Sequence, residues 1–91
     1  MADFWLGLQT LDRFVHRTTR VQNGADVSVL TRDVTRLLRT PLSGQSPVIT
    51  PHQIAPDEND VWCSLQRLVA RGQVVKFLSQ SHGVIHYRGI R

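Results

Sequence analysis

Arginine is the residue type whose number and spacing in this chain point most directly to chemistry. Ten of the eleven basic side chains are arginines, and a guanidinium group offers a planar fork of donors that suits phosphate and carboxylate oxygens. Six of them form two triplets with steps of four and three residues: Arg13, Arg17 and Arg20, and Arg32, Arg36 and Arg39. On a helix this spacing sets three guanidinium groups along one side, roughly 6 Å apart, which is similar to the spacing of phosphates along a nucleic-acid strand.

Most of these arginines lack the acidic neighbour that a solvated helix face usually provides. Asp33 is three residues from Arg36. Four arginines have no acidic residue four positions away: Arg13, Arg17, Arg32 and Arg39. The pattern therefore favours a partner that supplies the negative charge. Nucleic acid is the first expectation, and an acidic protein surface or plain solvation of the helices are the alternatives.

Metal binding and catalysis are not expected. Cys63 is the only cysteine, and His82 and His86 lie four residues apart on a segment that does not look helical. The chain contains no Cys-x2-Cys or His-Glu-x2-His spacing, no nucleophile elbow and no glycine-rich phosphate loop. We therefore predict a protein that is not an enzyme, with no cofactor.

Size and composition indicate one small domain over residues 1–91. The chain is 41% hydrophobic and 20% charged, with a net charge of +4, which favours folding over disorder. Its apolar runs are far shorter than the ~18 residues of a membrane span, and the N-terminus does not resemble a signal peptide. A single cysteine suits a reducing compartment, so a cytoplasmic protein is expected.

Apolar periodicity predicts helices at 3–20 and 27–39. Phe4, Leu8, Leu11 and Val15 lie on one face of the first. The second has its own apolar stripe and can be capped by Asp26 or Ser28.

The following segment, 41–49, is expected to be a loop that ends in a very short strand at 48–49. Thr50 to Ala55 should form a short helix, with Thr50 and Gln53 in a capping box and Pro51 at the first helical position. Asp57 caps a longer helix over 57–71, which Gly72 terminates. Residues 73–78 and 84–88 should pair as a β-hairpin.

The order helix, short strand, short helix, turn, longer helix and hairpin resembles the winged helix-turn-helix superfamily. Over 27–91 the resemblance rests on Thr50-Pro51-His52-Gln53-Ile54-Ala55, on Val61-x3-Leu65-x2-Leu68-x3-Gly72-x-Val74 and on His86-Tyr87-Arg88. It implies an α+β winged helix-turn-helix fold, with residues 1–20 as an extra N-terminal helix. The segment between Ala55 and Val61 is shorter than the usual turn, and a three-helix α+β domain with a hairpin but no nucleic-acid role is the alternative.

The resemblance implies a DNA interface centred on the helix at 57–71. If Val61, Trp62, Leu65 and Leu68 face inward, Arg67 is placed to read guanine, Asn59 adenine, and Ser64 a base or a phosphate. The remaining expected DNA contacts are Arg71 on the same helix, phosphate contacts from Arg32, Arg36, Arg39, Lys76 and Arg88, and His82 at the tip of the wing. The acidic cluster Asp57-Glu58-Asn59-Asp60 is unfavourable beside phosphates.

The first helix has a wide apolar face that suits dimerisation. Its expected contact residues are Phe4, Trp5, Leu8, Leu11 and Val15; in the alternative, the helix folds back on its own domain. The sequence thus predicts a homodimeric DNA-binding transcriptional regulator. The main alternative is a protein-interaction module, an adaptor or inhibitor from a mobile element, that docks through its acidic helix start and its arginine-rich faces. A third is a subunit that contacts RNA or single strands.

Overall fold

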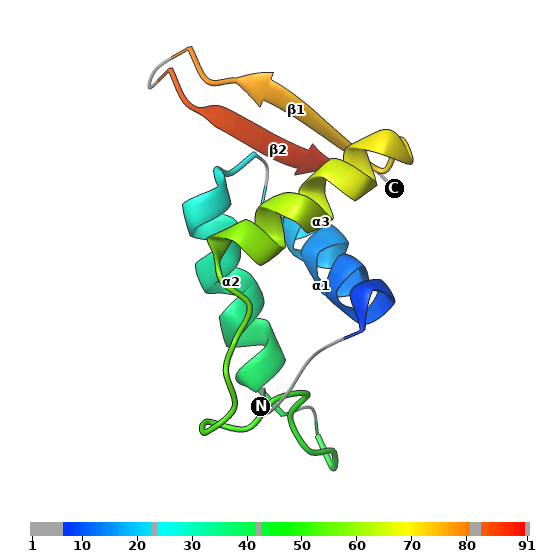
Figure 1. Cartoon of the computed structure of the whole chain (residues 1–91), viewed down its shortest axis with the longest axis vertical. Coiled ribbons are helices and arrows are strands. Elements are labelled where there is room, and N and C mark those ends of the chain that lie inside the picture. The colour runs from blue at the N-terminus through cyan, green and yellow to red at the C-terminus, as the bar shows by residue number, and fades with distance from the viewer. Residues whose placement is uncertain (1–6, 23, 42, 81–82, 91) are drawn as a thin grey trace.

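The computed structural model describes residues 7–22, 24–41, 43–80 and 83–90. Its elements are α1 (Leu8–Val21), α2 (Val27–Arg39), α3 (Glu58–Ala70), β1 (Val74–Leu78) and β2 (Ile85–Gly89). The predicted α+β class is confirmed at this level, as three helices and a two-stranded antiparallel sheet in a layout consistent with a winged helix. The hairpin lies across one end of the three helices (Figure 1). No helix in the described part of the chain is long and apolar enough to cross a bilayer.

Local capping chemistry determines where α2 and α3 begin. The Asp26 side chain accepts a hydrogen bond from the backbone N–H of Val29 at 2.9 Å. At the start of α3, Asp57 accepts from the Asp60 N–H at 2.8 Å, and Asp60 accepts in return from the Asp57 N–H at 3.0 Å. This reciprocal arrangement is a capping box. It provides acceptors for two backbone N–H groups that have no partner within the helix. After α3, Gly72 adopts a φ of +75°, as expected for a glycine that ends a helix.

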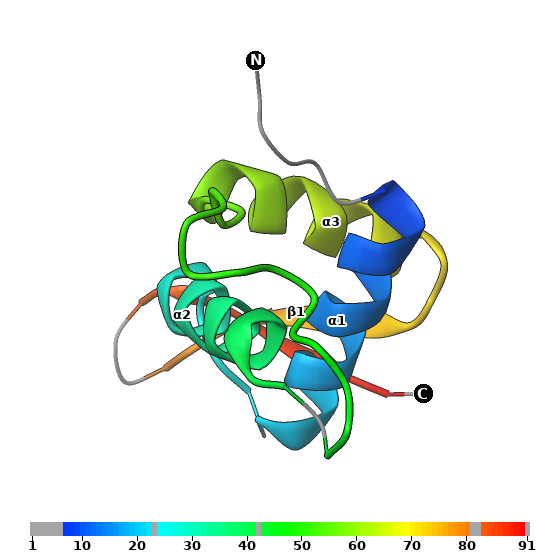
Figure 2. The ribbon, with the colours of Figure 1, turned by 90° about the horizontal axis from the view of Figure 1, so that it is seen from below.

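The core is built from the apolar stripes of all three helices. Figure 2 shows the helices packed around a shared interior. The fully buried positions there include Leu11 and Val15 of α1, Leu30, Val34 and Leu38 of α2, and Val61, Leu65 and Leu68 of α3. The helices are therefore held mainly by burial of apolar area, which in a domain of this size leaves little surplus stability.

The role expected for the first helix needs correction, because α1 belongs to the core instead of standing outside a separate 27–91 unit. Leu11 is 2% exposed and Val15 is 0% exposed, both covered by this chain. They are therefore not available as dimerisation residues. Leu8 is 52% exposed, while Phe4 and Trp5 lie outside the described residues.

The predicted hairpin is present. Each strand begins one residue later than predicted, the first ends at residue 78 as predicted, and the second ends one residue later. β1 and β2 are antiparallel, with Val74 opposite Gly89 and Leu78 opposite Ile85. Val74 and Tyr87 are buried, so one face of the hairpin packs on the helices. Ala25, between α1 and α2, exchanges backbone hydrogen bonds with Tyr87 at 3.2 and 2.8 Å. This single bridge adds a third segment beside β2 and joins the helix connection to the sheet.

Two predicted short elements did not form. Residues 50–55 make a single turn, in which the Thr50 N–H donates to Gln53 Oε1 at 2.7 Å and the Gln53 N–H donates to the Thr50 carbonyl at 3.1 Å. Pro56 follows too soon for further helical turns, because the residue before a proline is disfavoured in helical conformation. Residues 48–49 are not a strand, since the Ile49 N–H bonds to the Leu38 carbonyl at 3.1 Å and its side chain is buried beside the end of α2.

Replacing Gly89 with Ala should loosen the contact between β2 and α1. The added Cβ would lie 2.7 Å from Thr19 Oγ1 and 3.0 Å from the backbone nitrogen of Arg20. Thr19 is fully buried, so we expect a loss of about 1–3 kcal/mol in the free energy of unfolding, measured in urea. Gly7→Ala is the control, because a Cβ there meets nothing within 4 Å. Equal unfolding midpoints for the two variants would contradict the packing described.

Candidate nucleic-acid interface

The orientation of α3 differs from the sequence-based expectation at two positions. Ser64 was expected on the outer face but is 0% exposed, and Trp62 was expected in the core but is 49% exposed. Ser64 lies three residues after Val61 and four before Leu68, which is inward spacing on a helix. The error came from counting the large apolar Trp62 as a core residue, which rotated the expected faces of the helix.

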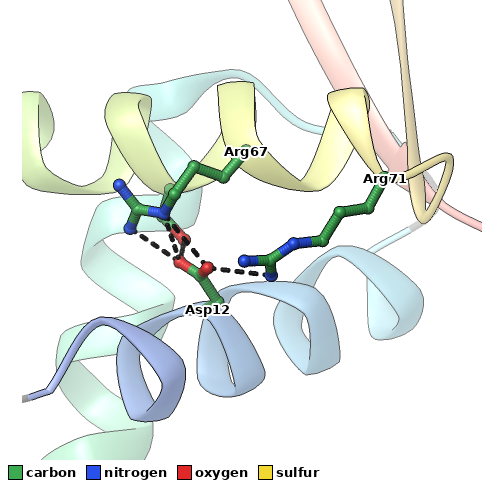
Figure 3. A network of polar contacts seen from close by, with 4 residues as sticks. Asp12, Arg67 and Arg71 are labelled. Carbon is green, nitrogen blue, oxygen red and sulfur yellow. Dashed lines mark hydrogen bonds and ion pairs between the residues drawn. The ribbon is translucent and has the colours of Figure 1, made fainter.

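Arg67 and Arg71 do not project freely from α3; both reach Asp12 on α1 (Figure 3). Arg67 donates from Nη2 to Asp12 Oδ1 at 2.7 Å and from Nε to Oδ2 at 3.1 Å. Arg71 donates from Nη1 to Asp12 Oδ2 at 3.1 Å, and the Ser64 hydroxyl donates to Oδ1 at 2.7 Å. The Asp12 side chain is only 5% exposed. Three residues expected to contact DNA are thus joined in one network between α1 and α3.

This network favours the ionised form of Asp12. Burial alone would raise the pKa of the Asp12 carboxyl, but hydrogen bonds from Arg67 and Ser64, together with the positive charges of Arg67 and Arg71, outweigh it. The pKa therefore lies below its ordinary value of 3.8. The hydrogen bonds to Asp12 also raise the pKa of Arg67. For Arg67 to read a base, it would have to leave a buried carboxylate without its main partner, which is energetically costly.

The outer side of α3 has little positive charge to offer DNA. Glu58, Asn59 and Trp62 are exposed there, and the Asp57 and Asp60 carboxylates cap the same end of the helix. Asn59 is accessible as expected, but its neighbours would face phosphates with negative charge. Insertion of this helix into a DNA groove is therefore electrostatically unfavourable.

The two arginine triplets lie on adjacent helices and are exposed. Arg32 and Arg36, with side chains 68% and 69% exposed, come within 3.9 and 3.6 Å of Asp33. Arg39 donates to the Gln53 carbonyl at 3.0 Å. Within the described residues, no carboxylate lies within 4.0 Å of the triplet on α1, which comprises Arg13, Arg17 and Arg20.

One arginine from each triplet lines a groove of about 340 Å³ between α1 and α2, together with the carboxylate of Asp33. Arg17 lines it from α1 and Arg36 from α2, with Val21 and Leu37 as apolar lining. Arg17 of α1 thus joins Arg36, an expected site residue of α2. The α1 triplet is not among the DNA contacts predicted from the sequence.

The basic side chains of the hairpin do not converge. In the sheet register Lys76 is opposite Tyr87 and Arg88 is opposite Val75, so Lys76 and Arg88 project from opposite faces. Arg88 lies over the Phe77 ring, 5.8 Å from its centroid, while Lys76 is exposed near the edge of the sheet. They cannot form one phosphate clamp, and His82 lies outside the described residues.

Sequence reasoning did not single out Asp12 or His16, both on α1. Asp12 is a carboxylate within the apolar stripe, one residue after Leu11 and three before Val15, and this position was a signal of burial. The Nε2 atom of His16 is buried and has no hydrogen-bond partner among the residues that the structure describes. Burial, and then the charge of Arg20, lower its pKa, which favours neutral imidazole.

The part of the chain that the structure describes contains no group of three or more His, Cys, Asp or Glu side chains arranged to hold a metal ion. No model of a known protein family, no curated protein and no solved structure matches the chain.

Proposed function

We propose that the protein binds double-stranded DNA through phosphate contacts made by the arginines of α1 and α2. The observation that carries the proposal is the exposure of six arginines on two adjacent helices. One carboxylate, Asp33, lies near two of them among the described residues. An array of this kind suits a partner with regularly spaced negative charge, because each neutralised phosphate releases condensed counterions.

The arrangement of elements also supports a winged-helix protein, with a different assignment of its first helix. A winged helix has the order helix, short strand, helix, helix and hairpin. The elements α1, Ala25, α2, α3 and β1–β2 follow this order, because Ala25 pairs with β2. The connection of residues 40–57 is far longer than the tight turn of a helix-turn-helix. In this assignment α1 is the first helix of the fold.

The proposed binding mode provides affinity with little sequence discrimination. Phosphate contacts position a protein on a duplex, whereas contacts to base edges specify the sequence. Of the three residues expected to contact bases, Arg67 and Ser64 are held by Asp12, and Asn59 is exposed beside acidic residues. The transcriptional role, the homodimer and the cytoplasmic location remain predictions from the sequence.

The test replaces Arg17 and Arg36, which line the groove from opposite sides. Each Ala substitution should weaken binding to a fluorescent duplex of about 20 base pairs by roughly tenfold at low salt, since each removes a charged hydrogen bond. The loss should be the same for two unrelated duplex sequences, as expected for phosphate contacts. Anisotropy titration measures both.

The matched control is the double variant Arg17→Lys, Arg36→Lys, which keeps both charges and should bind DNA nearly as well as the parent chain. Absence of binding to duplex DNA at low salt would refute the proposal. An unchanged affinity in the double Ala variant would place the interface elsewhere.

A further inference from the structure

A second surface, distinct from the arginine groove, lies between the hairpin and the beginnings of α2 and α3. In Figure 1 the end of the hairpin where β1 finishes and β2 begins lies above the start of α2. The cleft there has a volume of about 380 Å³. Its apolar lining includes Val27, Trp62, Val84 and Ile85, and its carboxylates are Asp26 and Glu58.

The apolar part of this cleft is unusually accessible for such a small domain. Trp62 is 49% exposed, Ile85 43% and Val84 41%. Leu78, opposite Ile85 in the sheet, is 60% exposed. A half-exposed tryptophan among aliphatic side chains is typical of the anchor positions that dominate binding energy at protein interfaces.

The charge of the cleft is opposite to that of the chain as a whole. Among the described residues, its lining contains two carboxylates and no basic side chain, although the net charge of the protein is +4. Asp26 is engaged by the Val29 N–H. Glu58 is exposed and makes no hydrogen bond or ion pair within the described residues, so its carboxylate is free to receive a cation from outside.

We propose that this cleft binds a segment of a partner protein that sets an apolar side chain against Trp62 and an arginine or lysine against Glu58. The acidic lining disfavours nucleic acid, because phosphates are also negatively charged. Its apolar area favours binding of an apolar side chain, whose surface is then removed from water. A second copy of this chain is a poorer match. The apolar stripes of its arginine-bearing helices, including Leu11, Val15, Leu30 and Val34, are buried in its own core.

The inference goes beyond the proposed DNA function and uses other residues. None of the arginines of α1 and α2 lines this cleft. Loss of DNA binding and loss of peptide binding are thus separate results, obtained with different variants.

The test uses the full chain with Trp5→Phe, which leaves Trp62 as the only tryptophan and a fluorescent reporter of the cleft. The probe is an eight-residue peptide of alternating Leu and Arg. Two further peptides replace Arg with Glu or Leu with Ser. We expect a saturable change in Trp62 emission with the Leu–Arg peptide, and at least tenfold weaker binding of the other two.

Variants then locate the binding. In the same background, Glu58→Gln and Ile85→Ser should each weaken the Leu–Arg peptide several-fold, and Glu58→Lys at least tenfold. Ile54→Ser is the matched control, because Ile54 is 65% exposed and does not line the cleft. Circular dichroism and urea midpoints check that each variant is folded.

Three results would overturn the proposal: no saturable change in emission, equal binding of all three peptides, or equal weakening by Ile54→Ser and Ile85→Ser. Sedimentation of the parent chain tests whether a second copy of the chain occupies the cleft. Self-association that Glu58→Lys abolishes would replace the partner segment with a second copy as the occupant.

Discussion

Replacing Asp12 with Ala is expected to lower the free energy of unfolding by about 3–5 kcal/mol, the range for removing one partner from a buried ion pair. The substitution leaves Ser64 and Arg67 without their acceptor inside the α1–α3 contact, where the Asp12 side chain is 5% exposed. Arg71, with a side chain 52% exposed, can return to water, which favours the lower end of the range. Because domains of this kind are stable by about 5–15 kcal/mol in total, a large part of the stability should be lost. Urea denaturation measures it.

Asp33→Ala provides the comparison. Asp33 also lies near two arginines, but their side chains are 68% and 69% exposed. The Asp33 side chain itself is 13% exposed and also accepts a hydrogen bond from Gln22 Nε2. Ion pairs to exposed arginines contribute roughly 1 kcal/mol or less, and one hydrogen bond to a neutral donor about 1 kcal/mol, so Asp33→Ala should cost less than Asp12→Ala. Equal losses would show that the Asp12 network is not the main polar contact between α1 and α3.

The same network predicts how stability depends on pH. The pKa of Asp12 is lower in the folded protein than its ordinary value of 3.8. The carboxylate therefore stabilises the folded state fully above that ordinary value, and the contribution is lost as the pH falls through the folded-state pKa. Asp12→Asn should remove this part of the acid dependence. Urea midpoints of the two proteins between about pH 5 and pH 2 should converge as the pH falls.

DNA affinity is expected to fall steeply with salt. If the six arginines of α1 and α2 each neutralise one phosphate, log K should decline against log salt with a slope of about −5. Between 50 and 200 mM salt, this corresponds to a loss of roughly a thousandfold in affinity. Anisotropy titrations at four or more salt concentrations give the slope.

The slope of log K against log salt also measures the number of phosphate contacts. The double variant Arg17→Ala, Arg36→Ala should have a slope smaller in magnitude by about 2, since each lost phosphate contact reduces it by roughly one. Arg17→Lys, Arg36→Lys should keep the slope of the parent chain. A slope near zero in the parent chain would mean that phosphates contribute nothing, and the DNA proposal would fail.

Features with a local cause were predictable from the sequence. Asp57 and Asp60 are three residues apart and bond each other's backbone N–H, so the start of α3 needed no tertiary information. Gly72 ends the helix through its own conformational freedom. The hairpin follows from two β-rich runs joined by polar turn residues. The arginine triplets also depend only on helical periodicity, and their exposure was inferred from the same pattern.

The positions and partners of the expected site residues on α3 depended on contacts between residues that are far apart in the sequence. Arg67 and Asp12 are 55 residues apart, and no local pattern indicates that they meet. Once α1 packs on α3, a buried carboxylate needs compensating donors, and Ser64, Arg67 and Arg71 are the ones within reach. Side-chain size and polarity, weighed above helical spacing, placed Trp62 and Ser64 on the wrong faces.

The existence of α1, α2 and α3, the caps of α2 and α3, and the hairpin were determined by the sequence itself, because neighbouring residues make those interactions. The tertiary structure alone decided that α1 completes the core, that Asp12 occupies two arginines of α3, and that Trp62 stays half exposed above an acidic cleft. These outcomes depend on which apolar stripes bury one another and on which polar groups are then enclosed with them. The arginines of α1 and α2 were left at the surface because their helices turn the opposite faces inward.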